Sequence, residues 1–180
     1  MAFFRRNETP APPPAAAPSA PAVPAAQAVE NRKQMHHNLI LAYLDSQNWK
    51  YTVKDGFMEF GMGIKSKIGN CRIVVVPGEK EIQSYAFCPI KASKDTYANV
   101  VEYITRANYG LKVGKFEFDY RDGEVRYQTC LPSRDGTPSL QEVEFIVDLP
   151  MLMLQKYGDG LAKNLMGFGD PEKDVAEVEG

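Results

Sequence analysis

Hydrophobic residues recur at helical spacing in three stretches of the chain. The first covers residues 31–47, where Asn31 can cap the first turn. The second covers residues 93–108, with Ser93 or Asp95 as the candidate cap and Asn108 near its end. Both stretches therefore predict amphipathic helices that bury one face.

The third stretch, residues 139–168, contains a proline at position 150. A proline ring clashes with the carbonyl group four residues earlier and removes one hydrogen-bond donor. We therefore expect one helical segment to end at Asp148 or Leu149, and a second to begin with Pro150 in its first turn.

Alternating or β-branched residues predict strands in the remaining segments. Residues 57–65 show the clearest pattern: apolar side chains alternate with Glu59, Gly61 and Gly63, which would share the opposite face. We expect the apolar positions Met58 and Phe60 to lie in the core. The expected strands are residues 50–54, 57–65, 71–76, 81–88, 111–120 and 124–131, with a bulge near Gly114.

The resulting element order is α-β-β-β-β-α-β-β-α. Every link between strands is a hairpin or a helical crossover of modest length, which favours antiparallel pairing. We predict an α+β fold with an antiparallel sheet of about six strands and with helices packed on one face.

Composition divides the chain of 180 residues into three parts. Residues 1–30 hold 17 alanines and prolines and predict a disordered, extended arm. Residues 31–168 form the predicted folded domain. Residues 169–180 are acidic and are expected to be a disordered tail.

The net charge of the chain is −2, and the acidic tail leaves the rest close to neutral. A body without a basic excess argues against nucleic acid as a partner. No stretch approaches the roughly 18 apolar residues of a membrane span. The start of the chain lacks the order of a signal peptide, so we expect a cytoplasmic protein.

Residue types that carry chemistry are sparse. His36 and His37 are adjacent on a helix and diverge by about 100°, so they cannot share one metal ion; we expect them to be exposed or half-buried. Cys71, Cys88 and Cys130 fall in predicted strands without ligand spacing. We therefore predict no catalytic residue, no cofactor and no metal site.

Two small charged groups have ordinary structural interpretations. Lys65, Lys67 and Arg72 read as a solvated basic loop that could contact a phosphate. Asp119, Asp122 and Glu124 cluster around a hairpin turn, and calcium would need more oxygen ligands in a longer loop.

The succession that begins in the second helix resembles the YbjN family of bacterial proteins over residues 34–168. The similar positions are Val100-Val101-Glu102-Tyr103-Ile104, Asn108, Gly114, Phe116, Asp119, Gly123, Val125 and Arg126. The resemblance implies a fold similar to type III secretion chaperones, which are often dimeric and hold partner peptides. It also implies a regulatory role in sensory transduction, and it transfers no catalytic residue.

The first functional hypothesis is a non-enzymatic, chaperone-like module that binds a protein or peptide partner and can form a homodimer. Glu59, Gly61 and Gly63 are the candidate partner-binding residues, because small side chains let another chain approach closely. The alternative is a small-molecule sensor with a pocket between sheet and helices. An enzyme is disfavoured because no acid, base and nucleophile set is visible.

Overall fold

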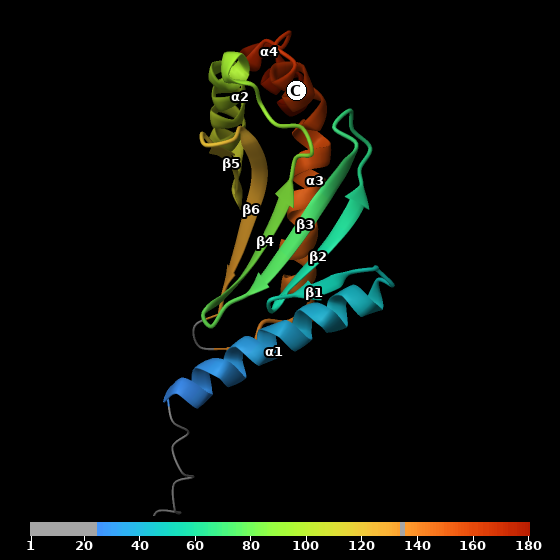
Figure 1. Ribbon diagram of the computed structural model, residues 1–180, viewed down its shortest axis with the longest axis vertical. Helices are drawn as coiled ribbons and strands as arrows, with labels where there is room; N and C mark the ends of the chain where they lie inside the picture. The colour runs from blue at the N-terminus through green and yellow to red at the C-terminus, as the bar shows by residue number, and fades with distance from the viewer. Residues whose placement is uncertain (1–24, 134–135) are drawn as a thin grey trace, which may run out of the picture.

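The computed structural model describes residues 25–133 and 136–180. These residues form a six-stranded antiparallel sheet and four α-helices, which confirms the expected α+β fold (Figure 1). The helices are α1 (Ala25–Ser46), α2 (Tyr97–Gly110), α3 (Leu140–Leu165) and α4 (Pro171–Glu179), and a 3₁₀ turn, Lys94–Thr96, precedes α2. The strands are β1 (Thr52–Lys54), β2 (Phe57–Gly63), β3 (Asn70–Pro77), β4 (Glu81–Phe87), β5 (Lys115–Asp119) and β6 (Glu124–Pro132).

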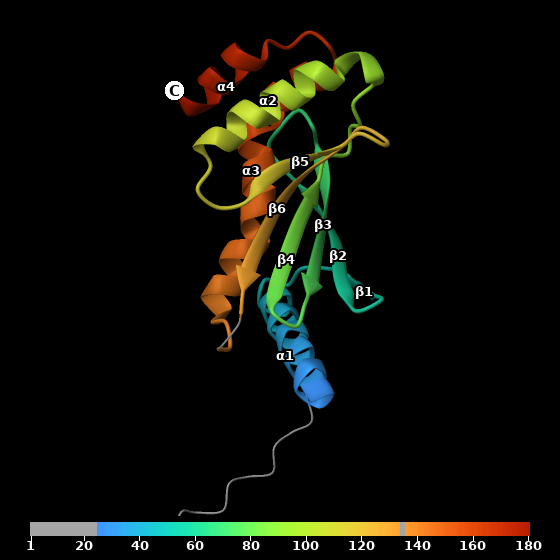
Figure 2. The ribbon, with the colours of Figure 1, turned by 90° about the vertical axis from the view of Figure 1, so that its left-hand side faces the viewer.

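The strand order is β1-β2-β3-β4-β6-β5, so the chain places β6 inside the sheet and leaves β5 at one edge. Alternate residues of β2, β4 and β6 point toward the helices and are mostly buried, whereas all three residues of β1 are exposed. Met58 and Phe60 belong to this inner face, as expected, and so does Phe116. Figure 2 shows α3 running along the sheet, α2 and α4 at its upper end and α1 at its lower end.

Four fully or almost fully buried tyrosines fill the space between sheet and helices: Tyr43, Tyr103, Tyr127 and Tyr157. Each hydroxyl finds a hydrogen-bond acceptor, as buried hydroxyl groups require. Tyr43 donates to Asp148 at 2.6 Å and so joins α1 to α3. The core is thus dense and internally satisfied at these positions.

The expected break at Pro150 is wrong, because α3 continues through this residue. Pro150 leaves the Ile146 carbonyl without its usual helical donor. The hydroxyl of Thr129, on β6, donates to that carbonyl at 2.6 Å, and this side chain is almost completely buried. A donor from the sheet therefore replaces the missing N–H, which local sequence could not indicate.

Two glycines in the second half of α3 serve close packing and do not end the helix. A Cβ atom on Gly160 would lie 2.6 Å from the Tyr103 hydroxyl oxygen. A Cβ atom on Gly158 would lie 2.3 Å from the Ser66 hydroxyl oxygen. The absence of side chains thus lets α2 and the β2–β3 connection approach α3.

The first helix begins at Ala25 and includes Asn31 in its interior, so the expected boundary at residue 30 is wrong. The proline tract ends at Pro24, and alanine-rich sequence follows it with high helix propensity. Residues 1–24 lie outside the described residues, so the predicted disorder of the arm stays a prediction there.

The predicted disordered tail is also wrong for most of residues 169–180, because they contain α4. Asp170 caps this helix by accepting a hydrogen bond from the backbone N–H of Lys173 at 3.2 Å. Val175 is buried in the core, and Asp174 is only 4% exposed. The acidic composition of this segment suggested disorder, but the segment forms a capped helix that packs one face against the core.

The hairpin after α2 differs from expectation at its start. Gly114 has a φ of 75°, a left-handed conformation that favours glycine, and β5 begins after it at Lys115. The expected strand residues 111–113 therefore lie in the connection between α2 and β5.

Candidate functional site

The face of the sheet opposite the helices is left uncovered by the described residues (Figures 1 and 2). The strand register arranges its side chains in rows across the sheet. One row contains Gly61, Arg72, Phe87, Arg126 and Glu117. The next row contains Glu59, Val74, Tyr85, Gln128 and Lys115.

Arginines cover the aromatic rings of this face. The Arg72 guanidinium carbon lies 3.9 Å from the ring centroid of Phe87. The guanidinium carbon of Arg126 lies 4.6 Å from the centroid of Tyr85. Such stacking orients the planar guanidinium over the negative face of the ring.

Carboxylates hold the same arginines from the side. Arg126 donates to Glu117 at 2.8 Å from both its Nε and its Nη2 atoms. Arg72 lies 3.6 Å from a carboxylate oxygen of Glu59. The face is therefore a pre-arranged patch of aromatic and arginine side chains whose charges are balanced within it. Tyrosine and arginine are the residue types that most often anchor protein interfaces.

The three sequence-predicted site residues all lie on this face, on strand β2. Glu59 contributes its carboxylate to Arg72, as described above. Gly61 is exposed, and a Cβ atom built on it would meet no atom within 4 Å. A Cβ on Gly63 would lie 3.2 Å from the Asn70 side-chain oxygen. Because Gly61 and Gly63 have no side chains, the backbone of β2 is accessible at this end of the face.

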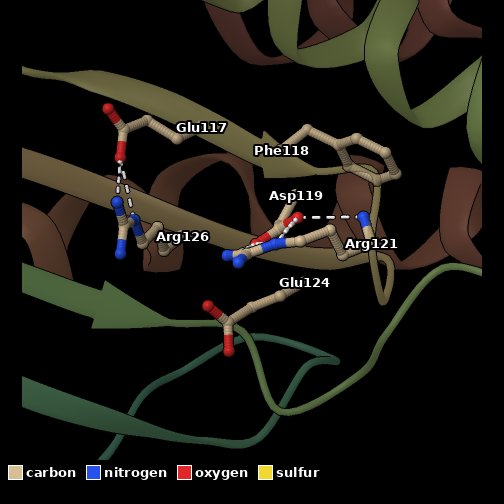
Figure 3. A pocket seen from close by; sticks show the side chains of 6 residues that line it. All are labelled: Glu117, Phe118, Asp119, Arg121, Glu124 and Arg126. Carbon is tan, nitrogen blue, oxygen red and sulfur yellow. Dashed lines mark hydrogen bonds and ion pairs between the residues drawn. The ribbon is translucent and has the colours of Figure 1, made fainter.

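A polar pocket of about 360 Å³ continues the face at the β5–β6 hairpin (Figure 3). Arg121 binds the Asp119 carboxylate there, and these hydrogen bonds lower the pKa of Asp119 to about 2. Glu117 and Arg126 pair on the other side of the pocket. Each guanidinium group is thus paired with a carboxylate, which offsets its charge within the pocket.

The turn chemistry of this hairpin is as expected. Asp122 accepts a hydrogen bond from the backbone N–H of Glu124 at 3.2 Å, and Gly123 has a φ of 76°. Asp122 also forms an ion pair with Lys91, which lowers the pKa of this carboxyl. The acidic cluster is thus part of the turn.

The expected basic loop is split between two elements. Lys65 and Lys67 lie in the β2–β3 connection, whereas Arg72 lies within β3 on the uncovered face. The alternation of side chains in β3 places Arg72 on the outer face. The run of apolar residues that follows Arg72 shows no alternation, so the sequence did not indicate which face it occupies.

The two histidines do not form a site. His36 is fully buried, contrary to expectation, and its Nδ1 atom lies 2.8 Å from the Gly78 carbonyl oxygen. That carbonyl can only accept, so Nδ1 carries the proton. His37 is half-buried on α1. His36 therefore ties α1 to the β3–β4 turn.

The cysteines are free thiols, and two of them are buried. Burial raises the pKa of Cys71 and of Cys88 to about 11 in each case, so both remain protonated near neutral pH. A protonated, buried thiol is a poor nucleophile. Cys130, on the uncovered face of β6, is exposed.

This difference in exposure gives a prediction. Partial burial and Glu81 raise the pKa of Cys130 as well, so exposure alone distinguishes it. In the native protein we expect a thiol reagent such as DTNB to react first with Cys130, ahead of the two buried thiols, and with all three in denaturant. Absorbance of the released chromophore measures the count. Loss of the fast phase in C130S assigns it, whereas fast reaction of two or three native thiols would contradict the described burial.

No three His, Cys, Asp or Glu side chains gather as a metal site would need, within residues 25–133 and 136–180. In the same part of the chain, no helix has the length and apolarity to cross a membrane.

Sequence reasoning missed Tyr85 and Phe87, the aromatic centre of the uncovered face. Both occupy alternate positions of β4, so the signal was present in the strand pattern. The sequence does not show the strand register, and it is the register that brings Arg72 and Arg126 beside these two rings.

Comparison with known proteins identifies the family. The model of the YbjN family, described as "Putative bacterial sensory transduction regulator", matches residues 36–163. No curated protein sequence matches the chain. A solved structure, titled "Crystal structure of YbjN, a putative transcription regulator from E. coli", is similar with a TM-score of 0.52 and 9% identity. The similarity covers 66% of this chain and 84% of that one. The fold agrees with that structure, and the chain belongs to the YbjN family.

Proposed function

We propose that this protein is a non-enzymatic, cytoplasmic regulatory module that binds a protein partner through the uncovered face of its sheet. The observation that carries the proposal is the patch formed by Tyr85, Phe87, Arg72 and Arg126 beside the open surface at Gly61. The family description, a regulator of sensory transduction, supports a role in signalling.

The chemistry of the patch favours a protein over other ligands. Stacked arginines and half-buried aromatics supply large contact areas with little loss of side-chain entropy. The carboxylates that hold Arg72 and Arg126 make the patch a weak site for phosphates. Three free cysteines are typical of a reducing compartment.

The alternative, a small-molecule sensor, requires a pocket between sheet and helices. Four tyrosines occupy that space, and each is at most 2% exposed. The pocket at the β5–β6 hairpin opens on the uncovered face and is lined mainly by charged groups. Since drug-sized ligands prefer enclosed apolar cavities, the partner-binding role is better supported.

Bulky residues at the glycines test the proposal. The double variant Gly61→Tyr and Gly63→Tyr should lose the partners that the wild-type chain retains in affinity purification from its host, as measured by quantitative mass spectrometry. The fold should persist, with a melting temperature within about 5 °C of wild type, because tyrosine suits a strand.

The matched control is Leu152→Tyr, a change on the exposed side of α3, where the leucine is 48% exposed. It should retain the wild-type partners. An identical set of captured proteins for the face variant and for wild type would contradict the proposal.

A further inference from the structure

Strand β2 has an edge that its neighbour covers only in part. On this side, β1 pairs with residues 57–59 of β2 and no further. The second half of the strand, residues 60–63, pairs with β3 on the other side. Figure 1 shows β1 beside only the lower end of β2.

The hydrogen-bond alternation shows which residues face that edge. The N–H of Ile64 donates to the Gly69 carbonyl at 3.3 Å, so Ile64 faces the β3 side. In an antiparallel ladder alternate residues turn both backbone groups to the same side. Gly61 and Gly63 therefore turn their N–H and C=O groups away from β3, toward the uncovered edge.

The opposite edge of the sheet is closed by a side chain. Asn108 accepts a hydrogen bond from the Phe116 N–H at 2.7 Å and donates to the Phe116 carbonyl at 3.0 Å. This carboxamide occupies the outward backbone groups of Phe116, the second of the five residues of β5, and so covers part of that edge. Within the described residues, Gly61 and Gly63 have no such cap.

Lysines flank the open edge of β2. Lys50 and Lys54 precede and end β1, and Lys65 and Lys67 follow β2 within four residues of Gly63. All four are exposed, and none forms an ion pair with a described residue. Three acids lie near these lysines: Asp55 in the β1–β2 turn, Glu59 beside Arg72, and Asp159, which accepts a hydrogen bond from the Lys67 backbone N–H at 2.7 Å. The four lysines and Arg72 outnumber these acids, so the surroundings of the edge carry a small net positive charge.

We propose that an acidic peptide segment of the partner adds to the sheet as an extended strand along Gly61 and Gly63. Unpaired backbone groups select an extended chain, since each added N–H and C=O then finds a partner. The flanking lysines select carboxylates on that chain. This inference rests on the proposed function, and it specifies which partner segment the site takes.

Selection of random decapeptides displayed on phage against the full-length chain tests it. Enriched peptides should be rich in Asp, Glu and β-branched residues. Binding of a synthesised enriched peptide, measured by fluorescence anisotropy, should weaken about tenfold or more in Gly61→Pro. Proline removes the edge-facing N–H, a position where strands tolerate it.

A further variant makes the outcome independent of whether Gly61→Pro folds. The double reversal Lys50→Glu and Lys65→Glu changes exposed side chains and should also weaken binding about tenfold or more.

The contrary results are distinct. Absence of enriched peptides, enrichment without acidic residues, or binding that survives both Gly61→Pro and the lysine reversal would overturn the strand-addition proposal. A peptide that is insensitive to Gly61→Pro but lost in Phe87→Ala would overturn it while keeping the proposed function of the face. A dimer that Gly61→Pro separates, measured by light scattering, would overturn it in favour of a second copy.

Discussion

Replacing Asp174 with alanine should lower the free energy of unfolding by about 2–4 kcal/mol. The carboxylate is 4% exposed and accepts three hydrogen bonds. They come from the Lys163 ammonium at 2.7 Å, the Asn164 amide at 2.9 Å and the Asp170 backbone N–H at 2.9 Å. Alanine would leave the buried Asn164 donor with the Gly160 carbonyl alone, and would free the start of α4.

Urea unfolding measures this loss, and amide hydrogen exchange should show α4 opening before the sheet. Glu177→Ala is the matched control, because Glu177 binds the same ammonium at 3.0 Å with a side chain that is 67% exposed. It should cost less than about 1 kcal/mol. Equal losses for both variants would show that the buried carboxylate does not anchor the helix.

Replacing Thr129 with valine should lower the free energy of unfolding by about 1–3 kcal/mol. The hydroxyl donates to the Ile146 carbonyl, the acceptor that Pro150 leaves open in α3. Valine keeps the shape of the side chain and removes the donor, so a buried carbonyl would lose its short hydrogen bond. Chemical denaturation gives the difference between the two proteins.

A double-mutant cycle separates this contact from general packing effects. Pro150→Ala restores a backbone N–H that can donate to the Ile146 carbonyl, so Thr129→Val should cost less in that background. A cost unchanged by Pro150→Ala would mean that the hydroxyl has another role. Thr129→Ser, which keeps the donor, should be milder than Thr129→Val.

Periodicity predicted the strands well because each side chain responds to its own face of the sheet. Met58 and Phe60 are buried and Glu59 is not, as their alternation indicated. The same rule predicted the helix that became α2 and its stop near Asn108. These features depend on neighbours within a few residues along the chain.

The features that sequence reasoning missed depend on distant partners. Pro150 lies in a continuous helix because Thr129 supplies a donor from the sheet. The C-terminal segment is helical because Asp174 meets Lys163 and Asn164 on α3, although the Asp170 cap and Pro171 were visible as a local signal. Composition alone suggested disorder there.

In the candidate site, too, the features that depend on one segment were predicted, and those that depend on distant segments were missed. The alternation of residues 57–63 placed Glu59, Gly61 and Gly63 together on one face. The aromatic and arginine patch arises from the register of three other strands, and the open edge arises from the short length of β1. Neither property can be predicted from one segment of the sequence, because both depend on how separate strands pair.

Site-specific photo-crosslinking tests the central claim, that the uncovered face binds a protein partner, most directly. A benzophenone amino acid replaces Phe87 in one variant and Leu152, on the opposite side of the molecule's core, in the other. In living host cells, position 87 should give discrete adducts with a protein partner, and position 152 should not. Adducts from position 152 alone, or none from position 87, would contradict a binding role for this face.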